Sequence, residues 1–455
     1  MSASGTVSVE RLRGSVNGTV VDPTDPGYDD ARSVFYGGID KHPVAVVRVA
    51  DERDVAAVIA FARAEGLELS IRSGGHSGAG HGVCDGIVLD LADLRGIRID
   101  PETRTATAQT GMTALEYSRA AAEHGLATGF GDTGSVGIGG ITLGGGVGYL
   151  VRKHGLTIDD LIGADVVTAD GELLHVDAAS HPDLFWAIRG GGGNFGVATT
   201  FTVRLHDLPG VVGGMLLLPA TVETVRGFLD AAAAAPEELS AIANVMPAPP
   251  MPFVPAEHHG RLSIMALMCY AGDAETGERA MAPFRSVATP LADMVRPIPY
   301  PDIYPPEDPD YHPTAAATTM FVDEVDTASI ETMLERLEAS TAMMRAVQIR
   351  PLGGAMARVP NEATAFAHRD RRFMINVAAL FSDPAERDGH QEWVDGLSAA
   401  IQRGPKAAYV NFLLDEGEER VRAAYPGETW DRLRRIKAAY DPQNVFRINQ
   451  NIPPA

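Results

Sequence analysis

The stretch IRSGGHSGAGHG, residues 71–82, runs from the end of an expected strand into a glycine-rich turn that carries a histidine, His76. Leu67, Leu69 and Ile71 alternate with polar residues, which is the two-residue period of a half-buried strand. Consecutive glycines let the backbone turn sharply and approach a ligand, and exposed N–H groups in such a turn suit a phosphate. A neutral imidazole there can also act as a nucleophile. Taken alone, the stretch favours a surface turn with a solvated histidine, so only the downstream segments of the chain can indicate a function for it.

The composition limits the class of protein. The chain has 455 residues, enough for two or three domain-sized units, and 45% of them are hydrophobic. The net charge of −22 argues against nucleic acid or an anionic membrane as a partner, because both would repel the protein. Two cysteines, Cys84 and Cys269, give neither a disulfide framework nor metal-ligand spacing, so no metal is expected. Residues 1–16 contain no apolar leader, and we expect a cytoplasmic protein.

The residues before the His76 loop predict a strand–helix–strand unit. Residues 42–50 are rich in valine and predict a strand, Asp51 can cap the next helix, and Gly66 ends it. The second strand, residues 67–73, then delivers the loop at its carboxyl end. In open α/β sheets, ligands gather at such ends.

A second glycine-rich stretch covers residues 129–148. It comes after a hairpin expected to turn at Asp100-Pro101 and a helix that begins with a Thr113–Glu116 capping box. Half of the twenty residues are glycine, a density too high for the interior of a strand or helix, yet apolar residues recur through the stretch. A backbone pressed against a large flat or anionic ligand fits both facts.

A third cluster, Gly191-x-Gly193-x-x-Gly196, has the spacing of a dinucleotide fingerprint. The fingerprint requires a strand before it and a helix after it, whereas this cluster has a short helix before it and a β-branched strand after it. We therefore reject an NAD site of the Rossmann type. Between the second and third clusters, residues 161–177 predict a hairpin about Asp170-Gly171.

Beyond Pro209, alternating helices and strands predict a second domain that extends to about residue 407. Proline-rich stretches at 246–260 and 290–313 are expected to cover a site or to act as linkers. Tyr300, Tyr304 and Tyr311 lie in the second stretch, and at least one of them is expected to face a pocket. The tail predicts a strand from Tyr409, a helix over 430–440 and a run of three amides at 449–451.

Taken together, these segments resemble the berberine-bridge-enzyme-like branch of the FAD-linked oxidases, whose FAD domain is of the vanillyl-alcohol-oxidase (PCMH) type. The resemblance spans nearly the whole chain, and within the branch it is strongest to the shorter bacterial members, which include the hydroxynicotine oxidases. The motifs that carry it, in chain order, are RSGGHS at 72–77, VGIGGITLGGGVGYL at 136–150, RKHGLTIDDL at 152–161, LFWAIRGGGGNFGVAT at 184–199 and YDPQNVFRINQNI at 440–452.

The resemblance implies an α+β fold of two domains. Residues 1–207, completed by 408–455, would bind FAD, and residues 208–407 would form an antiparallel sheet covered by helices. The implied reaction moves a hydride from a small organic alcohol or amine to flavin N5, with dioxygen as the second partner. Neither nucleic acid nor membrane is implied, and the chain would be a monomer or a homodimer.

The same resemblance assigns site residues one by one. His76 would bond covalently to the flavin 8α-methyl as a single link. Loops 72–78 and 132–146 would hold the pyrophosphate and the ring, and Gly196, Val197, Tyr409 and Asn411 would contact the nucleotide or lie beside the isoalloxazine. The full cofactor-binding set is Arg72, Ser73, Gly74, Gly75, His76, Ser77, Gly78, Asp132, Thr133, Val136, Gly137, Gly139, Gly140, Thr142, Gly146, Gly196, Val197, Tyr409, Asn411 and Asn449.

The chain departs from the family at three places. Thr133 stands where doubly linked members carry a cysteine, and Phe412 where plant members carry a tyrosine base. Apolar Met374 or Ile375 stands where other members carry a glutamate base. The residues left for the substrate side, assigned here as catalytic, are Gln348, Arg350, Asn376 and Tyr300.

The sequence leaves three functions open. The leading one is an FAD-dependent oxidase, and the second is a flavin dehydrogenase that uses another electron acceptor. The third, motivated by the missing bases, is a flavin-fold protein that binds its ligand without turning it over. In the family, valine at the position of Val136 goes with oxidase behaviour, whereas bulky Ile141 stands where some fast oxidases have glycine.

Overall fold

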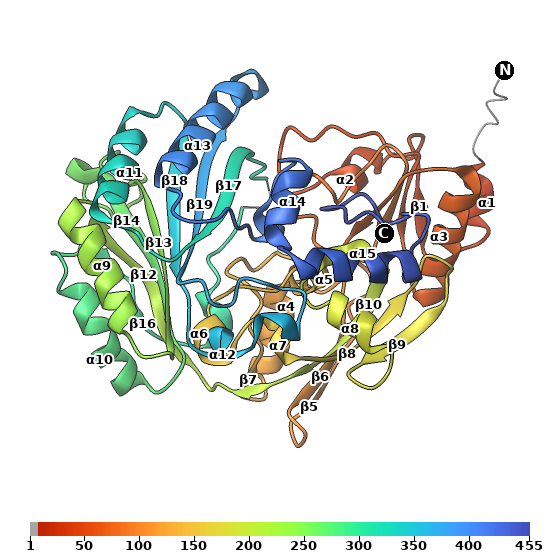
Figure 1. Ribbon diagram of the computed structural model, residues 1–455, viewed down its shortest axis with the longest axis horizontal. Helices are drawn as coiled ribbons and strands as arrows, with labels where there is room; N and C mark the ends of the chain where they lie inside the picture. The colour runs from red at the N-terminus through yellow and green to blue at the C-terminus, as the bar shows by residue number, and fades with distance from the viewer. Residues whose placement is uncertain (1–7, 309) are drawn as a thin grey trace.

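The computed structural model describes residues 8–308 and 310–455, so the first seven residues of the expected leader-free N-terminus lie outside the described part. Three main sheets and the glycine-rich segments between them make up the molecule (Figure 1). This mixed arrangement of helices and antiparallel sheets confirms the α+β class.

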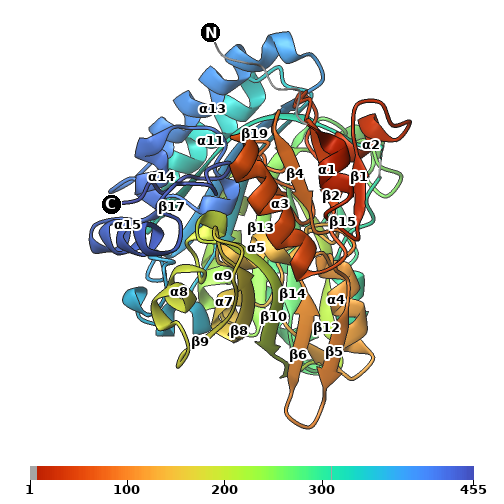
Figure 2. The ribbon, with the colours of Figure 1, turned by 90° about the vertical axis from the view of Figure 1, so that its right-hand side faces the viewer.

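The first sheet contains the predicted strand–helix–strand unit. Its order is β1 (Thr19–Val21), β2 (Ala45–Arg48), β4 (Ile87–Asp90) and β3 (Leu69–Arg72), with β2, β4 and β3 parallel. Helix α3 (Glu52–Glu65) joins β2 to β3; Asp51 caps it through the N–H groups of Arg53 and Asp54, and Gly66 ends it with φ +65°. The helix lies over this sheet in Figure 2. The strand β3 delivers the His76 loop as the sequence predicts.

The second sheet is antiparallel throughout and holds both predicted hairpins. Its order is β5 (Ile97–Asp100), β6 (Thr105–Gln109), β10 (Val197–Arg204), β8 (Leu161–Val167) and β9 (Leu173–Asp177). Helix α4 (Ala114–Ala122) starts with the predicted capping box, in which Thr113 and Glu116 bond each other's backbone N–H. A two-stranded ribbon pairs β11 (His206–Asp207) with β7 (Leu126–Ala127).

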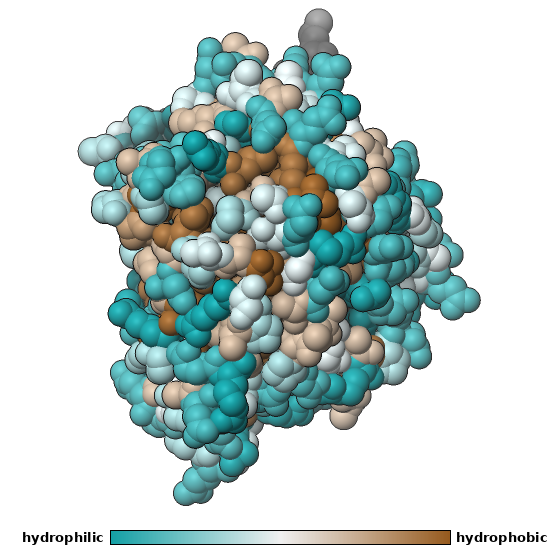
Figure 3. Space-filling model, turned by 90° about the vertical axis from the view of Figure 1, so that its left-hand side faces the viewer, coloured by the Kyte–Doolittle hydropathy of each residue, from teal (hydrophilic) through white to brown (hydrophobic). Residues whose placement is uncertain are grey.

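The third sheet has eight antiparallel strands drawn from residues 211–381. Its order is β15 (Ala292–Asp293), β12 (Val211–Pro219), β14 (Leu262–Tyr270), β13 (Leu239–Pro247), β18 (Met344–Pro351), β19 (Phe373–Phe381) and β17 (Thr314–Val322), with β16 (Arg296–Ile298) on β12. Four helices cover its outer face: α9 (Val222–Ala234), α10 (Ala274–Arg285), α11 (Thr327–Ala339) and α13 (Arg387–Ile401). Figure 3 views the molecule from this side, where hydrophilic residues predominate around smaller apolar patches.

The remaining helices lie outside the large-sheet layer. They are α1 (Val9–Arg13), α2 (Tyr28–Arg32), α5 (Ile138–Leu143), α6 (Val151–His154), α7 (Thr157–Asp160), α8 (Pro182–Ala187), α12 (Ala355–Arg358), α14 (Glu418–Ala424) and α15 (Glu428–Tyr440). The predicted tail helix over 430–440 is α15, which begins two residues earlier. Within the described residues, no helix is long and apolar enough to cross a bilayer.

Two predictions about local structure are wrong. Residues 129–148 do contain a helix, α5, in spite of their glycine content; an added Cβ at Gly139 would lie against Ser73, so the helix needs glycine there. Tyr409 starts no strand but precedes a single 3-10 turn, Val410–Phe412, because its hydroxyl is drawn into the glycine segment at Gly146 and Val147.

Candidate active site

The first two glycine-rich segments meet backbone to backbone. A Cβ on Gly74 would overlap the backbone of Gly137, and a Cβ on Gly137 would overlap Ser73. The Ser73 hydroxyl donates to the carbonyl of Thr110 at 2.6 Å, which fixes the loop to the residue directly after β6 of the second sheet. Only glycine therefore fits where the two segments cross.

The loop offers free backbone donors. Within residues 8–308 and 310–455, the N–H groups of residues 74–78 donate to no protein acceptor. Two polar atoms near the other glycine segments, Thr142 Oγ1 and Asn449 Oδ1, are buried without a partner. Gly140 and Gly193 have open space where a side chain would stand. Free N–H groups, unpartnered buried oxygens and side-chain-free surface are what the phosphates and rings of FAD require, so these residues fit that cofactor.

Arg72 supports the loop from beneath. Its guanidinium donates to Asp90 at 2.7 Å and to the carbonyls of Ala31 and Ser33. The Arg72 side chain is buried, and both of its terminal nitrogens donate to these partners. Arg72 would therefore act on the cofactor only indirectly, by holding the loop in its conformation.

His76 is held between an aromatic ring and a hydroxyl. Its ring stacks on Phe35 with centroids 4.2 Å apart, and its Nε2 lies 2.8 Å from Ser135 Oγ. Burial lowers the pKa of His76 from 6.5 to about 4, and the charge of Glu307 opposes this only in part. The imidazole is therefore neutral at pH 7, the state in which a ring nitrogen can act as a nucleophile.

The C-terminal residues close the site from the other side. The Tyr409 hydroxyl accepts from the N–H groups of Gly146 and Val147, at 3.0 and 3.2 Å. Asn411 donates to the carbonyl of Ile141 at 3.0 Å, and Asn449 donates to that of Gly193 at 3.2 Å. Val197 begins β10, directly after Gly196, whose φ of +157° is accessible to glycine. The sequence-predicted cofactor set is thus gathered around the three glycine clusters.

A row of polar side chains crosses the inner face of the large sheet. Strand register aligns Asn244 of β13 with Gln348 of β18, Gln348 with Asn376 of β19, and Asn376 with Thr319 of β17. Gln348 donates to Asn244 Oδ1 at 2.8 Å, and Asn376 Oδ1 is buried with no hydrogen-bond partner in the part of the chain that the structure describes. The neighbouring residues of these strands, such as Val347 and Ile349, pack in the core on the outer, helix-covered face. Sequence reasoning missed Asn244 and Thr319; the signal was one amide in the apolar strand LSAIANVMP.

Arg350 connects this row to the second glycine segment. Its Nη2 donates to Asp132 at 2.6 Å, and its Nε donates to Gln348 at 2.8 Å, which confirms that Gln348 and Arg350 point the same way. The guanidinium lies over the ring of Phe412, and Nη1 is buried without a partner. The Arg350 and Asp132 side chains are 5% and 17% exposed, so the pair is largely desolvated.

Three tyrosines form a buried group nearby. The ring centroids of Tyr149 and Tyr300 lie 6.2 and 6.0 Å from that of Tyr304, and none of the three hydroxyls has a hydrogen-bond partner among the described residues. Burial raises the pKa of Tyr304 to about 12 and raises the pKa values of Tyr149 and Tyr300 well above 10. All three hydroxyls therefore keep their protons and can donate. Tyr149 was not anticipated from the sequence, and Tyr311 is 42% exposed.

A hollow borders the His76 loop. It has a volume of about 680 Å³ and is lined by Gly78 and Ala79, by Thr318 and Thr319 of β17, and by residues from α13 and from 414–420. Thr319 is also the end of the polar row. The hollow therefore borders the terminal strand β17 of the large sheet, and helix α13 lines it as well.

Comparisons with known proteins agree with this geometry. Residues 43–177 match the family described as FAD binding domain, and residues 408–453 match the family described as berberine and berberine like. The FAD-linked oxidoreductase YvdP of Bacillus subtilis is 31% identical over 97% of this chain and 99% of its own length. The chain belongs to the berberine-bridge-enzyme-like family of FAD-linked oxidoreductases.

Solved structures support the same assignment. The 6-hydroxy-D-nicotine oxidase of Arthrobacter nicotinovorans superimposes with a TM-score of 0.85 at 27% identity, covering 97% of this chain and 99% of that one. A xylooligosaccharide oxidase of Myceliophthora thermophila, in complex with xylobiose, gives 0.84 at 25% identity, covering 98% and 99%. The predictions of an enzyme and of FAD as its cofactor are confirmed at this level.

The three positions that the resemblance matches to the usual bases of the family, Met374, Ile375 and Phe412, hold apolar side chains. Met374 pairs in register with Arg350 and belongs to a core cluster beside Tyr409, whereas Ile375 packs under the outer helices. Phe412 lies under the Arg350 guanidinium. None of the three can accept a proton, so the titratable side chains beside the polar row are the Arg350–Asp132 pair and the tyrosines.

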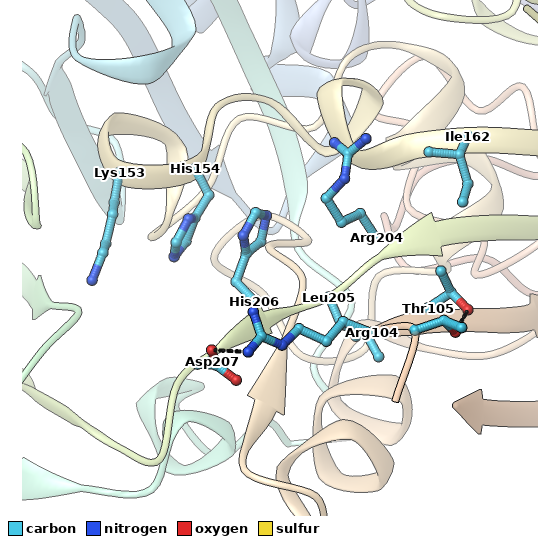
Figure 4. A pocket seen from close by; sticks show the side chains of 10 residues that line it. Arg104, Thr105, Lys153, His154, Ile162, Arg204, Leu205, His206 and Asp207 are labelled. Carbon is cyan, nitrogen blue, oxygen red and sulfur yellow. Dashed lines mark hydrogen bonds and ion pairs between the residues drawn. The ribbon is translucent and has the colours of Figure 1, made fainter. Parts of the chain in front are cut away.

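A separate pocket of about 450 Å³ lies at the outer end of the second sheet (Figure 4). His154 and His206 stack there with centroids 3.8 Å apart, and Arg104 pairs with Asp207 at 3.0 Å. No residue of the glycine segments or of the polar row lines it. It is therefore distinct from the flavin site of this family member.

Proposed function

We propose that this FAD-dependent oxidoreductase is an oxidase that takes a hydride from a small organic alcohol or amine and delivers the electrons to dioxygen. The observation that carries the proposal is the set of Asp132, Arg350, Gln348 and Asn376, which joins the glycine segments to the polar row of the large sheet. When bound, FAD accepts a hydride at N5 and passes two electrons to dioxygen. The protein's part is to bind and orient the substrate.

The proposal includes a covalent flavin at His76. Its neutral imidazole, its place in the loop with free N–H groups and the threonine at position 133 support a single link. Residues 1–207 with 408–455 would hold the cofactor, and residues 208–407 would supply the substrate side. The other members of the cofactor set would line the flavin and its phosphates.

The charges of the site favour a neutral reacting group. Arg350 is already paired with Asp132, so the pair contributes no net charge, and the three tyrosines are protonated donors. Arg350 Nη1 and the tyrosine hydroxyls can donate to a hydroxyl, ether or neutral amine. A neutral amine needs no proton abstraction before hydride loss, and an alcohol can hand its proton to Asp132.

The solved relatives show which substrates this architecture accommodates. Their names give a hydroxylated nicotine for one and a xylooligosaccharide for the other, an amine and a polyhydroxy compound. Both are called oxidases. The dehydrogenase alternative rests on Ile141, and the non-catalytic alternative on the missing bases; the relatives, named as oxidases and oxidoreductases, favour neither.

The remaining partners are inferred from charge. A net charge of −22 disfavours nucleic acid and anionic membranes, so the proposed partners are a small molecule and dioxygen. Both cysteines are free and buried, and a cytoplasmic location is proposed because thiols persist there.

The experiment has two parts. Acid-denatured protein should stay yellow, with the FAD mass on a peptide containing His76, and His76→Ala should release its flavin. A panel of alcohols and amines is then added without oxygen, and the substrate that bleaches the flavin should yield peroxide in air. Gln348→Leu should lower kcat/KM for that substrate on the order of tenfold by removing one polar contact, whereas Gln443→Leu, at an exposed side chain, should not. Flavin that bleaches but returns only with an artificial dye would identify a dehydrogenase.

A further inference from the structure

A carboxylate, a hydroxyl and the flavin-loop histidine form one chain of hydrogen bonds. The Ser135 hydroxyl donates to the carboxylate of Glu307, and the Ser135 N–H donates to the same carboxylate at 3.1 Å. Ser135 Oγ lies 2.8 Å from His76 Nε2. Phe35 stacks on the imidazole and fixes the plane of the ring.

The direction of this chain is set by the number of protons. A serine hydroxyl has one hydrogen, and Glu307 accepts it because an ionised carboxylate has no proton to give. Ser135 Oγ is then an acceptor toward His76, so Nε2 of His76 carries the ring proton. The other nitrogen, Nδ1, consequently keeps its lone pair, since the tautomer of a histidine is set by the bond its partner nitrogen makes.

The Glu307 carboxylate forms no ion pair with a described residue. Within residues 8–308 and 310–455, no arginine, lysine or histidine lies within ion-pair distance of its carboxylate. Glu307 comes from the proline-rich stretch 290–313, far along the chain from Ser135, and its side chain reaches over Gly134. The two hydrogen bonds described for the Glu307 carboxylate both come from Ser135. His76 is therefore the last group in the hydrogen-bonded chain that Glu307 polarises.

We propose that Ser135 and Glu307 are positioning residues that activate His76 for attachment of the flavin. This inference rests on the proposed covalent link. The bond that forms joins His76 Nδ1 to the 8α carbon, and the bonds that break are one C–H of the 8α-methyl and the Nε2–H of His76. The Nε2 proton leaves through Ser135 to Glu307. Two electrons and, in sum, two protons pass to dioxygen, the acceptor of the proposed reaction, which becomes hydrogen peroxide.

In this arrangement His76 is the nucleophile, Ser135 relays the proton and Glu307 is the carboxylate that accepts it. A base two hydrogen bonds away raises the electron density on the attacking nitrogen and accepts its proton as the new bond forms. The burial that keeps the imidazole neutral removes competing water from it. Ser135 and Glu307 are hydrogen-bonded in the chain that ends at His76 and not to the polar row. Replacing them should therefore change the rate of flavin attachment.

The test measures covalent flavin in the purified full-length protein as a function of time after FAD is supplied. Flavin fluorescence in denaturing gels and the mass of the His76 peptide give the attached fraction, and acid-extracted FAD gives the non-covalent fraction. Ser135→Ala and Glu307→Gln should slow attachment on the order of a hundredfold, the size of a general-base contribution, while extractable FAD accounts for the difference. Ser135→Thr, which keeps the hydroxyl, should restore the rate.

Two controls separate this role from structure and from the parent proposal. Asp302→Asn removes an exposed carboxylate from the same proline-rich stretch and should attach flavin at the wild-type rate. The double variant Ser135→Ala/Glu307→Gln should be no slower than Ser135→Ala, because both changes break one chain. Wild-type attachment rates in Ser135→Ala and Glu307→Gln would overturn the inference and leave the His76 link intact. Absence of covalent flavin in the wild type would overturn both.

Discussion

At the scale of single residues, the site depends on one largely buried ion pair. Arg350 and Asp132 come from distant parts of the chain and are 5% and 17% exposed. Removing one partner of such a pair leaves the other charge buried without compensation, which costs more than the pair contributes. Arg350 also holds Gln348 in place, so the same side chain links the glycine segment to the polar row.

Arg350→Met should lower the free energy of unfolding by about 3 kcal/mol and abolish substrate oxidation, because Asp132 loses its cation in a dry site. Arg358 supplies a matched control, since its pair with Glu237 is 61% and 40% exposed. Arg358→Met should cost less than about 1 kcal/mol and leave turnover unchanged. Urea unfolding followed by tryptophan fluorescence measures both. Equal losses in the two variants would contradict a special role for the buried pair.

The prediction that dioxygen reoxidises the flavin depends on Val136. It lies between Ser135 and Gly137, its carbonyl accepts the N–H of Ala114 at 2.9 Å, and its side chain is half-buried. Val136→Leu should slow reoxidation of the reduced flavin about tenfold, equivalent to roughly 1.4 kcal/mol, by crowding the approach of oxygen. Stopped-flow mixing of reduced protein with air-saturated buffer gives the rate. An unchanged oxygen rate together with an unchanged dye rate would show that Val136 is only an apolar anchor.

At the scale of elements, helix α15 locks the C-terminal segment onto the third glycine cluster. Lys437 is fully buried, and its ammonium donates to Asp441 at 2.7 Å and to the carbonyls of Asn194 and Phe446. Asp441 in turn accepts the N–H groups of Val445 and Phe446. One ammonium thus ties together the helix, the turn after it and the loop at residue 194.

Lys437→Met should lower the free energy of unfolding by roughly 3–5 kcal/mol, the cost of an uncompensated buried charge. Because the segment it holds carries Asn449, FAD in a His76→Ala background should also dissociate faster. Lys406→Met removes the 62% exposed partner of Glu419 and is expected to change neither quantity. Thermal unfolding and dialysis of flavin are the measurements, and a Lys437 variant as stable as the Lys406 variant would refute the locking role.

At the scale of the whole molecule, buried neutral histidines predict sensitivity to acid. Burial lowers the pKa values of His81 and His368 from 6.5 to about 4. Their folded-state pKa values lie below the unfolded ones, so the unfolded chain binds protons first as the pH falls. Their contribution is complete above about pH 6.5 and is lost toward pH 4, at most about 3 kcal/mol for each histidine.

The melting temperature of the holoprotein should therefore be level from about pH 8 to 7 and fall between about pH 6.5 and 4. His368→Gln should make that fall shallower, whereas His42→Gln, at a side chain that is 62% exposed, should leave its shape unchanged. Differential scanning calorimetry across this range provides the test. A profile in His368→Gln as steep as that of the wild type would mean that other groups govern the acid response.

The sequence by itself determined the parts of this protein that depend on local sterics. Glycines 74 and 137, the Asp51 cap, the Gly66 stop, the Thr113–Glu116 capping box and the reversed fingerprint at 191–196 each restrict only a few neighbouring residues. The α+β class and the family were predicted from the resemblance that the glycine-rich and terminal motifs carry, and both predictions are confirmed.

The tertiary structure decided what depends on register and on distant chain segments. Asn244, Gln348, Asn376 and Thr319 form a row only because four strands pair with specific offsets, which no single strand encodes. Glu307 reaches His76 through Ser135 across 172 and 59 residues of sequence separation. Tyr409 starts no strand, and its buried hydroxyl accepts from the backbone N–H groups of Gly146 and Val147, which lie more than 260 residues earlier in the chain.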